Sequence, residues 1–102
     1  MTITADQLRA ARALLKMEQR ALAEAADVPV QTLKRYEGTT GPLTGNYQNI
    51  SSIIRVLEAV GIIFLADGEA TVGGPGVRIA ARSDISDERV NALVANHSGP
   101  DE

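Results

Sequence analysis

Cysteine is absent from the 102 residues of this chain, and aromatic residues are scarce. The absence of cysteine excludes disulfides, zinc sites built on thiolates and cysteine nucleophiles. The chain has one Phe, two Tyr and no Trp, so we expect a core built mainly from Leu, Ile, Val and Ala. A chain of this length has room for one domain with one core, plus a short appended element.

Long apolar stretches and grouped metal ligands are absent as well. No run reaches the roughly 18 apolar residues that span a bilayer, and no secretory signal pattern opens the sequence. These features favour a cytoplasmic location and no membrane partner. His97 is the single histidine and has no cysteine or spaced carboxylate beside it. We therefore expect no metal site, no cofactor and no serine–histidine catalytic pair, and so no enzyme.

Charge is distributed unevenly along the chain. The net charge of −3 by itself disfavours binding to nucleic acid. Residues 1–61, however, carry seven Lys or Arg and six Asp or Glu, whereas residues 62–102 carry three and seven. The acidity belongs to the C-terminal part, so residues 1–61 can still present a locally positive face.

Three helices are predicted in the first forty residues. Thr4 and Gln7 form a capping box at the start of the first helix. Its apolar face is expected to comprise Leu8, Ala11, Leu14 and Leu15. A second helix is predicted over about residues 18–26 and a third over residues 30–37, with a tight turn at 27–29 and a stop at Gly38. Helices this short cannot each bury a face alone, so they must pack across one another.

A fourth helix shows the strongest pattern in the sequence. Asn46 is its expected N-cap, and Gly61 its C-terminal stop. Its predicted apolar stripe comprises Ile50, Ile53, Ile54, Leu57 and Val60. Beyond it, residues 62–65 and 77–80 are β-prone and predict a two-stranded hairpin around a glycine-rich loop. Residues 83–102 are expected to form an acidic tail, with a short helix beginning near Ser86.

The residues from the second helix to the end of the third follow a recognisable order. Gln19 is followed by Leu22-Ala23, then by the turn at 27–29, Thr32-Leu33 and Glu37-Gly38. At this spacing they resemble the lambda-repressor/Cro-like, or XRE, family of helix-turn-helix regulators. The resemblance implies a mainly α fold, with a four-helix repressor-type helix-turn-helix domain over residues 1–61. The β-hairpin over 62–82 and the tail over 83–102 then follow, and the hairpin is the first candidate for a dimer contact.

The same resemblance implies that the helix over residues 30–37 enters the major groove of DNA, with its N-terminal residues near the base edges. Gln31 can form two hydrogen bonds to adenine, and Arg35 two to guanine. Lys34 is expected on the same face, and Val30 is expected to contact a thymine methyl group. Outside this motif, we would take Gln31 and Arg35 for ordinary solvated helix residues.

Further residues are expected to contact phosphates or to position the DNA-reading helix. Gln19 matches the family's phosphate-contacting residue at the start of the second helix. The other candidate phosphate contacts are Thr32, Thr39 and Thr40. Arg12 and Glu37 occupy the positions of an ion pair that, in many family members, joins the first helix to the end of the third.

The chain also departs from the family pattern. Glu18 and Pro29 stand where Ser or Thr commonly begins the second and third helices, and the loop after Gly38 has no Lys or Arg. A negative charge at Glu18 opposes the phosphate backbone. We therefore expect DNA binding to depend on a second copy of the chain.

The expected function is sequence-specific transcriptional regulation by a homodimeric repressor. Its partner is double-stranded DNA, in the form of an operator with an inverted repeat. Pairing two copies doubles the small interface that one unit buries on DNA. The acidic C-terminal part supports an alternative, in which the same scaffold is an interaction module that neutralises a protein partner, as an antitoxin or an antiactivator. The sequence leaves both hypotheses open.

Overall fold

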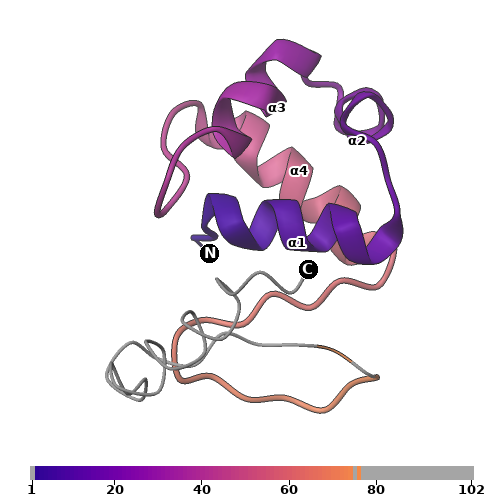
Figure 1. The fold of residues 1–102 in the computed structure, drawn as a ribbon, viewed down its shortest axis with the longest axis vertical. Helices are drawn as coiled ribbons and strands as arrows, with labels where there is room; N and C mark the ends of the chain where they lie inside the picture. The colour runs from indigo at the N-terminus through magenta and orange to yellow at the C-terminus, as the bar shows by residue number, and fades with distance from the viewer. Residues whose placement is uncertain (1, 75, 77–102) are drawn as a thin grey trace, which may run out of the picture. The chain divides into compact units, whose positions relative to one another are not determined.

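The computed structural model describes residues 2–74 and 76. In this part of the chain, four α-helices form and no strand: α1 (Ala5–Leu15), α2 (Gln19–Ala26), α3 (Val30–Glu37) and α4 (Tyr47–Ala59) (Figure 1). The predicted mainly α class and the four helices are confirmed. None of these helices is long and apolar enough to cross a membrane. The chain divides into two units, Met1–Ala66 and Asp67–Glu102, and all four helices belong to the first.

Helix α1 begins as its capping box predicts. The Gln7 backbone N–H donates to the Thr4 hydroxyl at 3.1 Å, and the Thr4 N–H donates to the Gln7 side-chain oxygen at 2.9 Å. Ile3 and Leu8, on either side of this cap, are fully buried. The helix ends at Lys16, which has a left-handed backbone conformation (φ 53°). The expectation that Leu14 faces the core is wrong, because its side chain is 59% exposed.

Helices α2 and α3 follow each other with only residues 27–29 between them. Their inward residues are buried as predicted: Leu22, Ala23 and Ala26 from α2, Leu33 and Tyr36 from α3, and Val28 between them. The turn is tight because Asp27 takes a left-handed conformation (φ 57°), which ends α2 and lets the chain change direction within a few residues. Neither Glu18 nor Pro29 caps its helix with a side-chain hydrogen bond.

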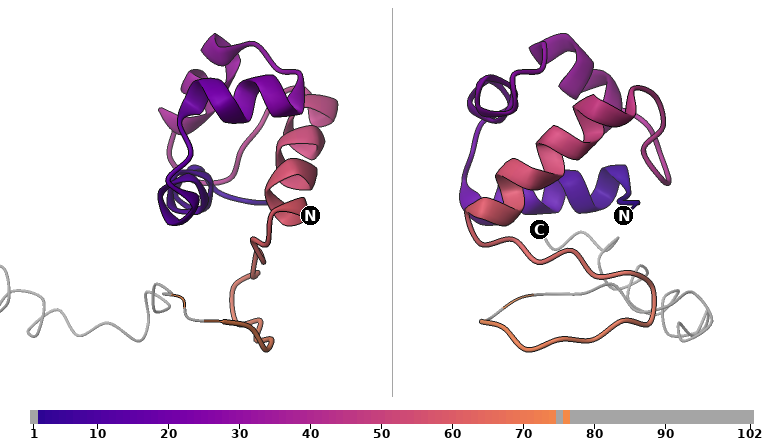
Figure 2. Two further views of the ribbon diagram at one scale, coloured as in Figure 1. Left: turned by 90° about the vertical axis from the view of Figure 1, so that its right-hand side faces the viewer. Right: turned by 180° about the vertical axis from the view of Figure 1, so that it is seen from behind.

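Helix α4 runs diagonally across the unit of four helices and passes in front of α1 when this unit is seen from behind (Figure 2). The Asn46 side chain caps it by accepting from the backbone N–H groups of Gln48 at 2.8 Å and Asn49 at 3.2 Å. Its buried residues are Ile50, Ile53, Ile54 and Leu57. Val60, predicted as the end of this apolar stripe, lies just past the helix and is 50% exposed.

The loop between α3 and α4 is fixed to the start of the chain. The Ala5 N–H donates to the Gly41 carbonyl at 3.1 Å, and the Leu43 N–H donates to the Ile3 carbonyl at 2.9 Å. These bonds flank an isolated antiparallel bridge between Thr4 and Pro42. Leu43 is buried beneath the loop, so this segment has a defined path although its composition indicates only a turn-rich connection.

Residues 62–66 belong to the same compact unit as the helices. The Ile62 N–H donates to the Leu57 carbonyl at 3.0 Å, Phe64 is buried, and the Gln7 side chain donates to the Leu65 carbonyl at 3.0 Å. Residues 62–65, expected as the first strand of a hairpin, form no strand. The expected second strand at 77–80, the helix near Ser86 and the acidic tail lie outside the described residues.

Candidate nucleic-acid interface

Helix α3 presents its polar side chains to solvent along one face. Gln31, Lys34 and Arg35 are all exposed, whereas Leu33 and Tyr36 are buried on the opposite face. The positions i, i+3 and i+4 of a helix lie on one side, so the sequence alone places these three polar side chains together. The structure therefore presents the predicted base-contacting residues as one accessible row.

The remaining residues of the predicted site differ in their availability. Val30 is half-buried and packs against the core, so its methyl groups are less accessible than expected. Thr32 is also half-buried. The Thr39 hydroxyl donates to the Tyr36 carbonyl at 2.8 Å, so in this conformation its proton is not available to a phosphate oxygen. Thr40 is exposed.

The predicted ion pair between α1 and the end of α3 is present. The Arg12 Nε and Nη2 atoms donate to the two carboxylate oxygens of Glu37 at 2.6 and 2.7 Å. This two-pronged geometry is the strong form of an arginine–carboxylate contact. The Glu37 side chain is only 4% exposed and that of Arg12 is 21% exposed. Arg12 also donates to the Met17 carbonyl at 2.9 Å, so one side chain joins α1, the α1–α2 turn and α3.

Gln19 joins the same cluster. Its side-chain amide donates to Glu37 Oε1 at 2.9 Å, which fixes the first residue of α2 to the last residue of α3. An amide nitrogen carries two protons, so one remains for a phosphate oxygen. The contact fixes the orientation of the side chain that the sequence predicts to contact phosphate.

Arg9 also contacts Glu37, which sequence reasoning missed. Its guanidinium donates to the Glu37 backbone carbonyl and forms an ion pair with Asp6. The signal available in the sequence was its spacing, because Arg9 lies three residues before Arg12 and therefore on the same side of α1. Two arginines of α1 thus bind the last residue of α3.

The ionisation of the ion pair follows from its surroundings. Burial by itself raises the pKa of Glu37, but hydrogen bonds from Arg12 and Gln19, with the charges of Arg12 and Arg9, outweigh it and lower the pKa. The hydrogen bond to Glu37 raises the pKa of Arg12, against the opposing effect of burial. Both groups are charged at neutral pH. The negative charge of Glu37 is therefore neutralised within the fold.

The exposed face of α3 is consequently cationic. Lys34 and Arg35 form no salt bridge with any residue that the structure describes. The Arg35 guanidinium lies 5.4 Å from the centroid of the Tyr36 ring, a distance at which a cation–π contact is favourable. Glu18, exposed beside Gln19, is the acidic residue that opposes this face at the start of α2.

Among residues 2–74 and 76, no group of three or more His, Cys, Asp or Glu side chains is placed to hold a metal ion. The exposed row of Gln31, Lys34 and Arg35 offers hydrogen-bond donors and positive charge to an anionic surface. Comparison with known proteins finds no matching family model, no matching curated protein and no matching solved structure.

Proposed function

We propose that this chain is a sequence-specific DNA-binding regulator that reads the major groove with α3. The observation that carries the proposal is the row of Gln31, Lys34 and Arg35, exposed side by side on a helix whose other face is buried. Gln31 and Arg35 have the donor and acceptor patterns that match adenine and guanine edges. A helix is also the element that fits the width of the major groove.

The ion-pair cluster supports this proposal because it orients the parts that contact DNA. Base contacts require side chains placed accurately by rigid elements. Arg12 and Gln19 both bind the Glu37 carboxylate, so the end of α3 and the start of α2 are held in one orientation. Gln19 then donates to a phosphate while Gln31 and Arg35 reach the bases.

A single copy offers only a small interface, with few cations. Of the chain's ten Lys and Arg residues, two lie on α3, and the neighbouring Glu18 opposes the backbone. We therefore propose that two copies bind an operator with an inverted repeat. Transcriptional repression is the regulatory outcome that we expect.

Selection of bound duplexes from a random DNA pool tests the proposal. We expect an enriched inverted repeat, bound with an affinity that falls steeply as salt rises, because phosphate contacts release counterions. The absence of any enriched sequence would refute sequence-specific recognition. Salt-sensitive binding without enrichment would show that the cationic face binds DNA non-specifically.

Arg35→Ala provides the residue-level test. Loss of a bidentate contact to guanine costs roughly 1–3 kcal/mol, or about 5- to 150-fold in discrimination at one position of each half-site. Arg55→Ala is the matched control, since Arg55 is an exposed arginine on α4 rather than on α3. We expect the control to leave the base preference unchanged. An Arg35→Ala protein with the wild-type preference at every position would remove Arg35 from the reading surface.

A further inference from the structure

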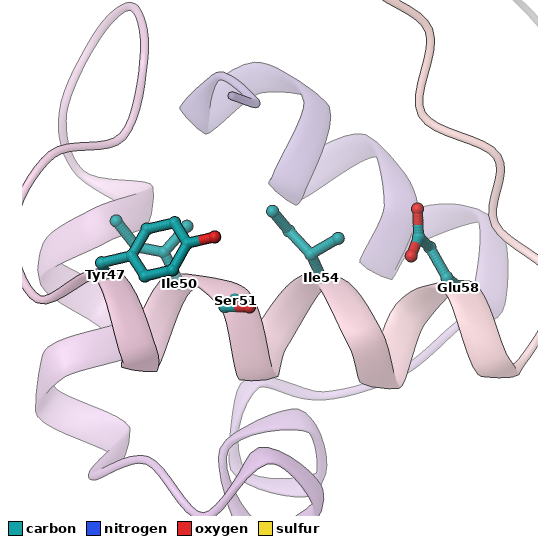
Figure 3. A pocket seen from close by; sticks show the side chains of 5 residues that line it. All are labelled: Tyr47, Ile50, Ser51, Ile54 and Glu58. Carbon is teal, nitrogen blue, oxygen red and sulfur yellow. The ribbon is translucent and has the colours of Figure 1, made fainter. Parts of the chain in front are cut away.

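A row of side chains along α4 lines a groove that the DNA-reading residues do not use. The groove has a volume of about 140 Å³ and is lined by Tyr47, Ile50, Ser51, Ile54 and Glu58. Tyr47 lies at one end of the row and Glu58 at the other, with the smaller side chains between them (Figure 3). At 1.5 Å per residue, the two ends are about 16 Å apart along the helix.

The two ends of this row are polar and unpaired. The Tyr47 side chain is 73% exposed, although it is one of only three aromatic residues in the chain. Within the described part of the chain, its hydroxyl makes no hydrogen bond, and the exposed Glu58 carboxylate makes neither a hydrogen bond nor an ion pair. Ile50 and Ile54, each 9% exposed, form the apolar floor between them. The row thus presents a donor at one end, a centre of two isoleucines and one serine, and an acceptor at the other end.

This order of side chains is complementary to itself when reversed. If a second α4 is laid antiparallel on the first, the Tyr47 hydroxyl of each copy meets the Glu58 carboxylate of the other. The same register brings Ser51 of each copy over Ile54 of the other, which is recessed at 9% exposure, so neither side chain keeps the two helices apart at the crossing point. A two-fold interface requires this reciprocity, in which residue i contacts residue j and j contacts i.

We propose that two copies of this chain associate through antiparallel pairing of their α4 helices, with each Tyr47 ring seated in the groove of the other copy. The hydroxyl then donates to a carboxylate, which is a stronger hydrogen bond than one between neutral groups. Tyrosine is suited to such a contact, because its ring buries a large apolar area while its hydroxyl keeps a polar partner.

The pairing is expected to be weak without DNA. A helix of thirteen residues is about 20 Å long, and its one face covers much less than the roughly 800 Å² per partner of a standard interface. Adjacent half-sites on DNA raise the effective concentration of the two copies. This inference deepens the proposed function by naming the surface that joins the dimer, yet its test contains no DNA. The amount of covalent dimer trapped therefore does not depend on whether the protein binds DNA.

The absence of native cysteine permits a direct test by disulfide trapping. We would oxidise the double variant Tyr47→Cys/Glu58→Cys at a protein concentration that favours association. The two introduced thiols are too far apart to join within one chain, because a disulfide spans at most about 7 Å between Cα atoms. In the proposed dimer, however, each thiol meets the other kind on the partner copy. Oxidation captures each encounter covalently, so we expect a covalent dimer although the two native side chains are replaced, whereas the control variants below that keep Glu58 also keep more of the native contact.

Two controls decide between this register and the alternatives. Gln48→Cys/Ala59→Cys has the same spacing and exposed positions but lies one residue further round the helix, so it should give far less covalent dimer. Tyr47→Cys alone should stay monomeric, because the two copies of this position lie at opposite ends of the contact. Equal trapping by both double variants would overturn the proposal. Trapping by the single variant would indicate a parallel arrangement and would overturn it equally.

Sedimentation equilibrium tests the contact without cross-links. Tyr47→Ala is expected to raise the dissociation constant of the dimer at least about 10-fold, since the residue enters the interface twice. Gln48→Ala should leave it unchanged. A wild-type chain that stays monomeric at millimolar concentration, or a Tyr47→Ala chain that dimerises as well as wild type, would contradict the proposal.

Discussion

The Arg12–Glu37 pair predicts strongly non-additive effects on stability. Glu37→Leu leaves the Arg12 guanidinium, 21% exposed, without the two carboxylate oxygens that it binds at 2.6 and 2.7 Å. Arg12→Met leaves a carboxylate that is 4% exposed without its main donor. Removing one partner of a fully buried pair costs about 3–5 kcal/mol. Since Arg12 retains some water contact, we expect about 2–3 kcal/mol for Glu37→Leu and about 3–4 kcal/mol for Arg12→Met.

The double variant Arg12→Met/Glu37→Leu should behave differently. Two apolar side chains of similar size leave no unpaired charge, and such replacements are often neutral or stabilising. We expect the double variant to lie within about 1 kcal/mol of wild type, although the Met17 carbonyl loses its donor. By contrast, each single variant removes a large part of the free energy of unfolding, which is roughly 3–10 kcal/mol for a unit of this size.

Urea unfolding followed by circular dichroism measures all four proteins. The free energies of unfolding should show a coupling of several kcal/mol between the two sites, provided that the slope with urea stays constant. Leu15→Ala, on the same helix but outside the pair, serves as a control that should combine additively with Glu37→Leu. If the losses of unfolding free energy in the two single variants simply add up in the double variant, Arg12 and Glu37 do not stabilise the fold as one charged unit.

Three further predictions concern single groups. The pKa of Glu37 is lowered in the fold, so its contribution is present above the ordinary value of 4.5 and is lost as the pH falls through the folded value; the difference in unfolding free energy between wild type and Glu37→Gln should therefore shrink in acid. The Tyr36 hydroxyl is buried with no partner among the described residues, so Tyr36→Phe should raise the unfolding free energy by about 1 kcal/mol in urea titrations. Asn46→Ala removes the cap of α4 and should lower the thermal midpoint by several degrees, at a cost of about 1 kcal/mol. An unchanged midpoint would show that the cap contributes little.

The helices and their ends could be predicted because local chemistry determines them. Thr4 and Asn46 cap their helices through side-chain oxygens within three residues, a range that the sequence shows directly. The row of Gln31, Lys34 and Arg35 was predictable for the same reason, since helical spacing alone sets it. The resemblance added the partner of Arg12, which lies 25 residues away and which no local pattern reveals.

The failures arose where burial depends on distant segments. At about 100° per residue, Leu15 lies within about 20° of Leu8 around α1, whereas Leu14 lies about 120° away. The predicted apolar face of α1 therefore included Leu14 at its edge, where the surrounding helices do not cover it. Residues 62–65 alternate in burial as a strand does, but the alternation arises from packing on the helices, with Phe64 inward and Ile63 outward. The sequence of residues 62–65 favours an extended conformation, but it does not show which part of the chain packs against them.

The hydrogen bonds between residues 3–5 and 41–43 close the first three helices into a ring, with α1 at one end and the loop after α3 at the other. Because these hydrogen bonds join residues 3–5 to residues 41–43, fraying at the start of the chain and motion of the loop are expected to occur together. Helix α3 is one of the three helices in this ring, and its last residue is bound by Arg9 and Arg12 of α1. Loosening of the first five residues is thus a route by which changes near the N-terminus affect the distant helix α3.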